Sequence, residues 1–174
     1  MLLTKLKGLN RLLFWRTPIP ERFLMKTDWD FSLSVPALPR PAISELQEKW
    51  PWVRRIAYDV SPVTPVRFRL ATVLWPGESN VDGPEYRRRI GFSESGKLLG
   101  YQQLLWLFEN QERFPVLLSF FGDVSIDAPG LVVVGEDGEE NSPYFHKRNG
   151  RWYVGWGQIF KVSFDRRCRV AIDE

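Results

Sequence analysis

The chain has 174 residues, which is enough for one domain with an appended segment, and its 44% apolar and 26% charged residues are typical of a folded protein. One cysteine, Cys168, and one histidine, His146, exclude an intrachain disulfide and a zinc site built from the His and Cys residues of a single chain. The net charge of +3 hides a segregation, because residues 1–20 carry +4, residues 101–145 carry −7 and residues 146–174 carry +4.

This charge segregation predicts complementary surfaces that pair within the fold or between subunits, or one basic face for an anionic partner. The lone cysteine gives no sign of an oxidising compartment. No apolar run approaches the roughly 20 residues that span a bilayer. We therefore expect a cytoplasmic protein without a transmembrane segment.

The first residues predict an amphipathic helix followed by an extended arm. Leucines recur at helical spacing in residues 1–16 among four bases, and no acid precedes Glu21. We interpret this segment as a helix that docks on the domain or on a second subunit, the alternative being a membrane-surface helix or a targeting segment. Five prolines in residues 17–41 then predict an irregular arm. Six large apolar residues of the helix and arm predict an interface with a protein partner or a second copy: Leu12, Leu13, Phe14, Trp15, Phe23 and Trp29.

A short helix and two strands are predicted next. Residues 42–50 are expected to form a helix that must end before Pro51. Residues 66–75 and 86–92 alternate between apolar and charged side chains, as half-buried strands do, and the turn-rich sequence between them predicts a hairpin. Paired in this way, the strands place four arginines on one sheet face: Arg67, Arg69, Arg87 and Arg89. This face is a candidate nucleic-acid surface, the alternative being ion pairs with the acidic residues 101–145 or with a second subunit.

Residues 97–112 predict the one long helix of the domain, whose apolar side chains cover so much of its surface that we expect it to be largely buried. Residues 116–121 and 124–134 predict short buried strands. Beside and within the second of these strands, Asp123 and Asp127 project from one face, which makes them weak candidates for a Mg²⁺ site or for acid catalysis. The alternative is that these carboxylates are solvated or pair with arginines.

The C-terminal region predicts a β-hairpin. Asn149-Gly150 is a strong signal for a two-residue turn, so residues 152–164 are expected to leave it as a strand. Alternation places Trp152 and Trp156 on the buried face of this strand. Three residues on the opposite face are candidates for contact with an anion or a nucleic acid: Arg151, Tyr153 and Lys161.

No catalytic or nucleotide-binding motif stands out. The chain has no P-loop, no dinucleotide-binding glycine pattern and no nucleophile elbow. The only histidine lies beside an apparent turn, where an ordinary surface role is the simpler interpretation. We therefore expect no cofactor, and a non-catalytic protein more readily than an enzyme.

Together these features predict a single α+β domain in residues 42–174, preceded by a helix and a proline-rich arm in residues 1–41. We expect a twisted, mainly antiparallel sheet packed on one long buried helix. The function that the sequence favours is a binding or accessory module, acting through protein–protein interaction or self-association of the N-terminal arm. Nucleic-acid binding by the arginine face and metal-dependent hydrolysis at Asp123 and Asp127 are the alternatives.

Overall fold

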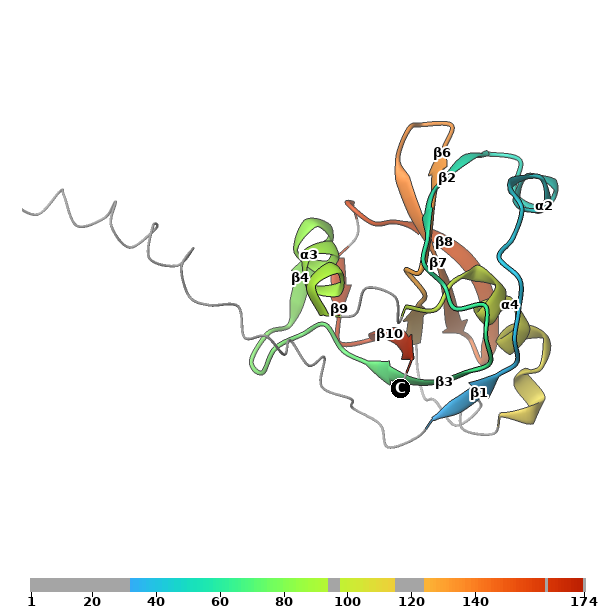
Figure 1. Ribbon diagram of the computed structural model, residues 1–174. Helices are drawn as coiled ribbons and strands as arrows, with labels where there is room; N and C mark the ends of the chain where they lie inside the picture. Colours follow the sequence, from blue (N-terminus) through green and yellow to red (C-terminus); the bar gives the residue numbers. More distant parts are fainter. Residues whose placement is uncertain (1–31, 94–97, 115–123, 162, 174) are drawn as a thin grey trace, which may run out of the picture.

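Strands dominate the computed structural model, which describes residues 32–93, 98–114, 124–161 and 163–173 (Figure 1). The strands are β1 (Leu33–Val35), β2 (Val53–Asp59), β3 (Val66–Ala71), β4 (Asn80–Asp82), β5 (Val124–Asp127), β6 (Leu131–Gly135), β7 (Glu140–Arg148), β8 (Arg151–Gln158), β9 (Ser163–Asp165) and β10 (Cys168–Asp173). The helices are α2 (Ile43–Lys49), α3 (Gly83–Ser93) and α4 (Tyr101–Glu109), followed by the 3-10 turn η2 (Gln111–Arg113). Within these described ranges no helix is long and apolar enough to cross a membrane.

Eight strands form one mixed sheet that forks at β7. They follow the order β1-β3-β10-β5-β7-β6-β2, and β8 lies along the other edge of β7. Neighbours are antiparallel except β10 and β5, which run parallel. β5 and β6 follow one another along the same edge of β7, interrupted at residues 128–130. Beyond this break β5 continues toward β10, β3 and β1, whereas β6 continues toward β2, so β7 is common to both halves.

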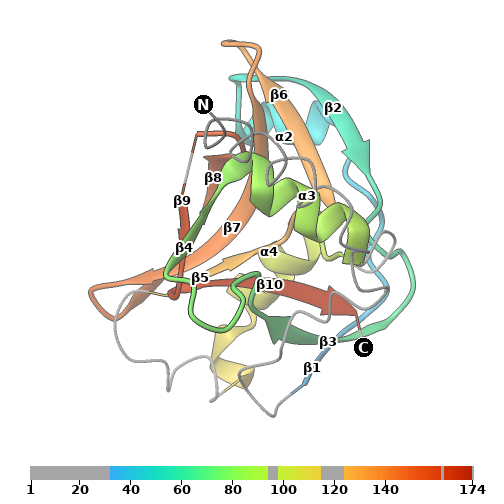
Figure 2. The same ribbon diagram turned by 90° about the vertical axis from the view of Figure 1, so that its left-hand side faces the viewer.

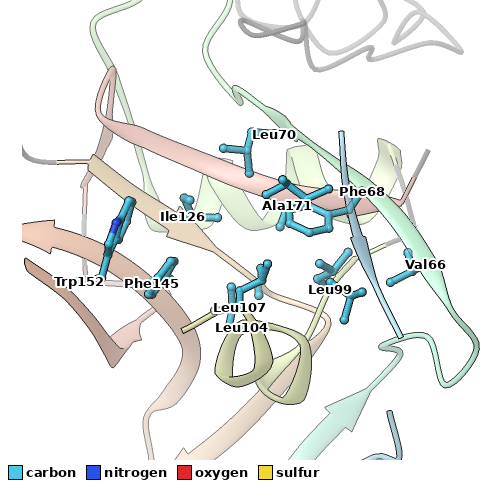
Figure 3. Close-up of a cluster of buried hydrophobic side chains, with 13 residues drawn as sticks. Val66, Phe68, Leu70, Leu99, Leu104, Leu107, Ile126, Phe145, Trp152 and Ala171 are labelled. Carbon is cyan, nitrogen blue, oxygen red and sulfur yellow. The ribbon is translucent and has the colours of Figure 1, made fainter. Parts of the chain in front are cut away.

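Helices α4 and α3 cover opposite faces of the half that contains β10 (Figures 1 and 2). Alternation along β10 explains this arrangement, because Ala171 belongs to the buried cluster beside α4, whereas Val170 and Ile172 belong to the cluster beside α3. On the α4 side, Leu104 and Leu107 share their cluster with residues of β3, β5, β7 and β8 (Figure 3). β10 is therefore buried on both faces.

The α3 side is closed by the small antiparallel ribbon of β4 and β9. Tyr86 and Ile90 of α3 are buried here, and the Tyr86 ring stacks on Phe164 of β9 with ring centroids 3.6 Å apart. Burying a large apolar side chain contributes roughly 1.5–3 kcal/mol. Contacts of this kind hold the helix and the ribbon against the sheet.

A third buried cluster lies in the other half of the sheet, where α2 and β2 meet α4 and β8. Its fully buried members are Leu46, Val53, Tyr101, Leu131 and Val133. Three partly buried tryptophans pack against them: Trp50, Trp52 and Trp156. This cluster forms the base of the pocket described below.

The predicted architecture of one long buried helix under a sheet is wrong. Strands outnumber helices among the described residues, the sheet is mixed, and the helix predicted over 97–112 is the nine-residue α4 followed by η2. Leu98 and Leu99, which were predicted to be helical, instead pair with β10. Leu98 forms a β-bridge to Ile172, and the Leu99 N–H donates to the Ala171 carbonyl at 3.2 Å. The predicted N-terminal helix lies in residues 1–31, outside the described residues, as do the six predicted interface residues and the strand predicted over 116–121.

The strand predicted over residues 86–92 is also wrong, since this stretch lies in the 11-residue helix α3. The Asp82 carboxylate accepts a hydrogen bond from the Glu85 N–H at 2.9 Å, as an N-cap side chain does, and Pro84 fits the first turn. Tyr86 and Ile90 are both buried and lie four residues apart, which is a helical spacing. The apparent alternation of apolar and charged residues was therefore a helical pattern.

Several local predictions are confirmed. The helix predicted over 42–50 is α2, and residues 66–71 of the strand predicted over 66–75 form β3, with Phe68 and Leu70 buried. Asn149 and Gly150 have φ values of +51° and +76°, so they form the predicted two-residue turn between β7 and β8. β8 ends at Gln158, earlier than predicted, and Trp152 is buried. β1 lies in the stretch assigned to the arm and pairs with β3.

Candidate functional site

The four arginines predicted to share a sheet face are divided between a strand and a helix. Arg67 and Arg69 lie on β3, whereas Arg87 and Arg89 lie on α3. Arg67 is exposed, and its Nε donates to the Ser32 hydroxyl at 2.6 Å. The predicted hairpin that was to align all four does not exist.

Arg89 is only 4% exposed and connects α3 to the segment that precedes the helix. Its guanidinium pairs with Glu78 at 2.5 Å and with Glu85 at 2.7 Å, and it donates to the Val73 carbonyl at 2.6 Å. Arg87 forms an ion pair with Glu140. These two arginines therefore have structural partners, one of them an acid of the 101–145 segment, as the alternative interpretation proposed.

The residues predicted to project outward from β8 have separate environments. Tyr153 is 44% exposed and stacks on His146 of β7, with ring centroids 5.4 Å apart. Arg151 is exposed at the start of β8, directly opposite Arg148. Lys161 lies beyond β8 and pairs with Glu139 at 3.1 Å. Only Arg151 and Tyr153 therefore share one surface.

Asp127 lies deep under α3. It is 4% exposed, the Ser125 hydroxyl donates to its carboxylate at 3.3 Å, and the Tyr86 side chain interacts with it. Burial raises the pKa of Asp127 to about 7. Asp123, its predicted partner in a metal site, lies outside the described residues. Within the described part of the chain no group of three His, Cys, Asp or Glu side chains is placed to hold a metal.

The candidate site with the most aromatic lining is a pocket that we call the tryptophan pocket, at the end of the sheet where β2, β6, β7 and β8 lie beside α2. It has a volume of about 540 Å³, within the usual size range of ligand sites. Its lining consists of three indoles, two carboxylates and two carboxamides: Trp50, Trp52, Trp156, Glu136, Asp137, Asn141 and Gln158.

The segment Trp50-Pro51-Trp52 supplies two of the three indoles. The backbone N–H of Trp50 donates to the Leu46 carbonyl at 2.7 Å and so ends α2. The backbone N–H of Val53 then donates to the Trp50 carbonyl at 2.9 Å. This is a four-residue turn with proline at its second position, where a fixed φ is favoured. The turn carries the chain from α2 into β2 and places both indoles beside Trp156 of β8.

The three indoles have a defined arrangement. Trp50 and Trp52 both stand nearly perpendicular to Trp156, at 77° and 84°, with ring centroids 6.3 Å and 5.8 Å away. Tyr101 of α4 stacks on Trp156 at 5.4 Å, and its hydroxyl accepts a hydrogen bond of 3.1 Å from the Trp50 indole N–H. Edge-to-face and stacked pairs of this kind are the favoured aromatic geometries. The walls of the pocket are thus fixed by neighbouring rings.

The turn between β6 and β7 supplies the acidic side of the pocket. Gly138 has φ +78°, a conformation that favours glycine. The Asp137 carboxylate accepts from the Glu139 N–H at 3.0 Å and from the Gln158 carboxamide at 2.8 Å. A Cβ at Gly135 would lie 2.9 Å from the Asp137 carboxylate and 3.2 Å from the Trp52 ring. Glycine at 135 therefore allows the carboxylate and the indole to approach the same point.

The electrostatics of the pocket favour a cation over an anion. Glu136 and Asp137 line it, and no lysine or arginine is among its lining residues. Glu136 forms an exposed ion pair with Arg54. The Asp137 carboxylate, by contrast, accepts hydrogen bonds from two neutral groups and forms no ion pair with the residues that the structure describes. The faces of indole rings carry negative electrostatic potential and add to this preference.

Sequence reasoning missed this site. It assigned Trp156 to the core and gave no role to Trp50 and Trp52. The local signal is the Trp-Pro-Trp turn after a short helix, but its meaning depends on β8, about 100 residues later in the chain. Comparison of the chain with protein-family models, curated proteins and solved structures found no match.

Proposed function

We propose that the chain is a non-catalytic binding module and that the tryptophan pocket is its ligand site. The observation that supports this most directly is the convergence of three indoles and two carboxylates on one pocket without a basic side chain in its lining. Ligand sites are usually concave and aromatic, with a small number of placed polar groups. The pocket has this composition.

The ligand group that suits this lining is a methylated ammonium, which combines positive charge with apolar surface. Tryptophan is the best aromatic partner for a cation, and an indole face attracts it by about 0.5–2 kcal/mol, depending on how far the cation is desolvated. Asp137 adds a negative charge beside the Trp52 ring. The methyl groups gain apolar contact with the indoles, which an inorganic cation would not.

The pocket is also prepared for binding before a ligand arrives. Trp156 is held by Tyr101 and by the two perpendicular indoles, and Asp137 is held by two hydrogen bonds. A site whose side chains are already ordered loses less conformational entropy on binding. This supports a binding role for Trp50, Trp52 and Trp156, whose rings are only partly buried in the fold.

A protein partner is the second part of the proposal. Such a partner would present the methylated ammonium on a lysine side chain, and the apolar residues of the N-terminal arm would extend the contact. Those residues, Leu12, Leu13, Phe14, Trp15, Phe23 and Trp29, lie outside the described part of the chain. Their contribution is tested separately by truncation.

The test is a calorimetric titration of the full chain with choline, with a trimethyllysine peptide and with the unmethylated peptide. The uncharged tert-butyl analogue of choline serves as the control for shape. We expect saturable binding of choline and of the trimethylated peptide, and clearly weaker binding of the uncharged analogue. Equal affinity for choline and for its uncharged analogue, or no saturable binding of either, would contradict a cation site.

Two variants connect that binding to the pocket. Trp52→Ala removes one wall and is expected to weaken choline binding about fivefold or more, and Asp137→Asn removes the charge at constant shape. Trp75→Ala is the matched control, because Trp75 is an exposed tryptophan that does not line the pocket. If Trp75→Ala weakened binding as much as Trp52→Ala, the ligand would not be in the tryptophan pocket.

A further inference from the structure

The outer face of the β7–β8 hairpin carries a second set of aromatic and basic residues, none of which lines the tryptophan pocket. Strand pairing places His146 opposite Tyr153, Arg148 opposite Arg151 and Tyr144 opposite Gly155. Directly paired residues share a sheet face, and so do residues two apart along a strand. The hairpin face therefore consists of Tyr144, His146, Arg148, Arg151 and Tyr153.

The rings of this face form a continuous row. Tyr144 and His146 have centroids 5.1 Å apart, and His146 and Tyr153 have centroids 5.4 Å apart with ring planes only 24° from parallel. Tyr153 is one of four large hydrophobic side chains that are exposed among the described residues. The row therefore ends in a ring that is open to solvent.

Glycines in β8 make room for this row. A Cβ at Gly155 would lie 2.9 Å from the Tyr144 Cζ and 3.0 Å from its hydroxyl oxygen, closer than real Cβ contacts. A Cβ at Gly157 would lie 3.4 Å from the same ring. The Tyr144 ring thus lies across the backbone of β8, and the absence of side chains at 155 and 157 widens the aromatic surface.

Two arginines stand at the end of the row, on either side of the Asn149-Gly150 turn. Arg148 and Arg151 are both exposed, and neither forms an ion pair with any residue that the structure describes. Like charges directly opposite one another destabilise a pair of strands. An anionic group between the two guanidinium groups would relieve this repulsion.

The face is also hollowed. A pocket of about 550 Å³ is lined by Tyr144, His146, Arg148 and Tyr153 of this face and, at one side, by Trp50, which also lines the tryptophan pocket. A second hollow of about 350 Å³ shares His146 and Arg148 and adds Lys147 and Arg167. Lys147 and Arg167 thus add basic side chains beside the aromatic row, although Arg167 is paired with Asp165 in the same hollow at 2.6 Å.

We propose that the hairpin face binds single-stranded nucleic acid. Unpaired bases would stack on the exposed Tyr153 ring at the end of the aromatic row, and phosphates would bind Arg148 and Arg151. Aromatic side chains stack on bases of any sequence, whereas in a duplex those base faces are already occupied by neighbouring bases. Arg151 and Tyr153 were already candidates for contact with a nucleic acid from the sequence, whereas Arg67, Arg69, Arg87 and Arg89 do not lie on this face. This binding would not require a ligand in the tryptophan pocket.

The test is fluorescence anisotropy of the full chain with labelled single strands of roughly ten nucleotides and with the matching duplex. The titrations are repeated between about 50 and 200 mM salt. We expect tighter binding of the single strand, with an affinity that falls as salt rises. No saturable binding at the lowest salt, or a duplex that binds as tightly, would overturn the proposal.

Variants separate stacking from charge. Tyr153→Ala is expected to weaken single-strand binding about fivefold or more. Arg148→Ala with Arg151→Ala is expected to reduce the slope of log affinity against log salt by about 1.4, because each phosphate contact on a single strand contributes about 0.7. Tyr153, Arg148 and Arg151 are exposed, so these variants should remain folded, and a cooperative thermal transition would verify this.

The matched control is Arg67→Ala, an exposed arginine on β3, which is four strands away from β8 in the sheet order. Its affinity for the single strand should equal that of the parent chain. Polyglutamate of similar length provides the control for charge alone. Equal losses in Arg67→Ala and in the hairpin variants, or equal binding of polyglutamate, would show a non-specific charge effect and would overturn the proposal.

Discussion

The indole N–H of Trp50 donates a hydrogen bond of 3.1 Å to the hydroxyl of Tyr101, which joins the end of α2 to the first turn of α4. The Tyr101 ring meanwhile stacks on Trp156 at 5.4 Å. One buried side chain therefore positions two of the three indoles of the tryptophan pocket. This relationship makes Tyr101 a positioning residue, which has no place in the lining itself.

Tyr101→Phe tests that role, because it keeps the stacked ring and removes only the acceptor for Trp50. We expect a loss of about 1 kcal/mol in the free energy of unfolding, the usual contribution of one hydrogen bond. Choline affinity should fall as well, since one wall of the pocket is less restrained. Chemical denaturation and calorimetric titration measure the two effects. Unchanged affinity together with reduced stability would mean that the hydrogen bond serves only the fold.

Asp127 predicts an unusual dependence of stability on pH. Burial raises the pKa of its carboxyl from 3.8 to about 7, so the folded state keeps a proton that the unfolded state has already lost. The stabilisation that the folded state gains by keeping this proton is fully present below pH 3.8. It is lost as pH rises from about 4 to 7, and the free energy of unfolding then falls by at most about 1.4 kcal/mol per pH unit. Denaturation at pH 5 and pH 8 should show lower stability at pH 8.

Asp127→Asn is the control for that prediction, because it removes the titration while keeping the size of the side chain. The difference in stability between pH 5 and pH 8 should become smaller in this variant. Glu85 acts in a separate range, since its ion pairs with Arg88 and Arg89 lower its pKa to about 2 and stability is lost as pH falls through that range. A parent chain more stable at pH 8 than at pH 5 would contradict the assignment.

Cys168 should react slowly with thiol reagents. Burial raises the pKa of its thiol to about 12, and the nearby Asp127 carboxylate contributes to the rise. Only the thiolate is nucleophilic, so at pH 8 very little of the reactive form is present. Labelling with iodoacetamide in the native state should be far slower than in denaturant. A native rate equal to that of a free cysteine would show that the pKa of this thiol is not raised and would contradict its burial.

Truncation separates the N-terminal arm from the sheet. Leu33 and Val35 of β1 are buried in the cluster beside α4, and β1 pairs with β3. Removing residues 1–35 should therefore destabilise the domain by about 3 kcal/mol or more, from the two apolar side chains alone. Removing residues 1–31 instead leaves β1 in place and avoids the loss of these two buried side chains.

The shorter truncation then tests the proposed partner contact. If the arm mediates self-association, the apparent mass in analytical ultracentrifugation should fall when residues 1–31 are removed. A parent chain that is already monomeric, with a mass that follows only chain length after truncation, would contradict self-association through the arm. Using the longer truncation instead would confuse loss of association with loss of folding.

Patterns confined to a short stretch predicted the structure well. Asn149-Gly150 specifies a turn by its own backbone preferences, so the β7–β8 hairpin needed no knowledge of distant residues. The alternation at Phe68 and Leu70 was equally local. At residues 86–92 the same kind of pattern predicted the wrong element, because Tyr86 and Ile90 fit both the two-residue period of a strand and the 3.6-residue period of a helix. Asp82 and Pro84 carry the local signal that distinguishes the two, since they form the start of α3.

The candidate sites depended on information that no short pattern carries. Trp50 and Trp52 meet Trp156 only because β2, β6, β7 and β8 are neighbours in that order. That order results from long-range pairing. The hairpin face was predictable in part, since alternation placed Arg151 and Tyr153 outward, but Tyr144 and His146 required the register of β7.

The fork of the sheet at β7, where residues 128–130 separate β5 from β6, has a consequence for how the chain folds. Both halves of the sheet attach to β7, and the two-residue turn lets β7 find β8 with almost no loss of chain entropy. The β3–β10 pairing, by contrast, brings together segments about 100 residues apart and carries the largest closure cost. We therefore expect the hairpin to assemble early and to serve as the template on which the two halves of the sheet are completed, with β10 joining β3 late.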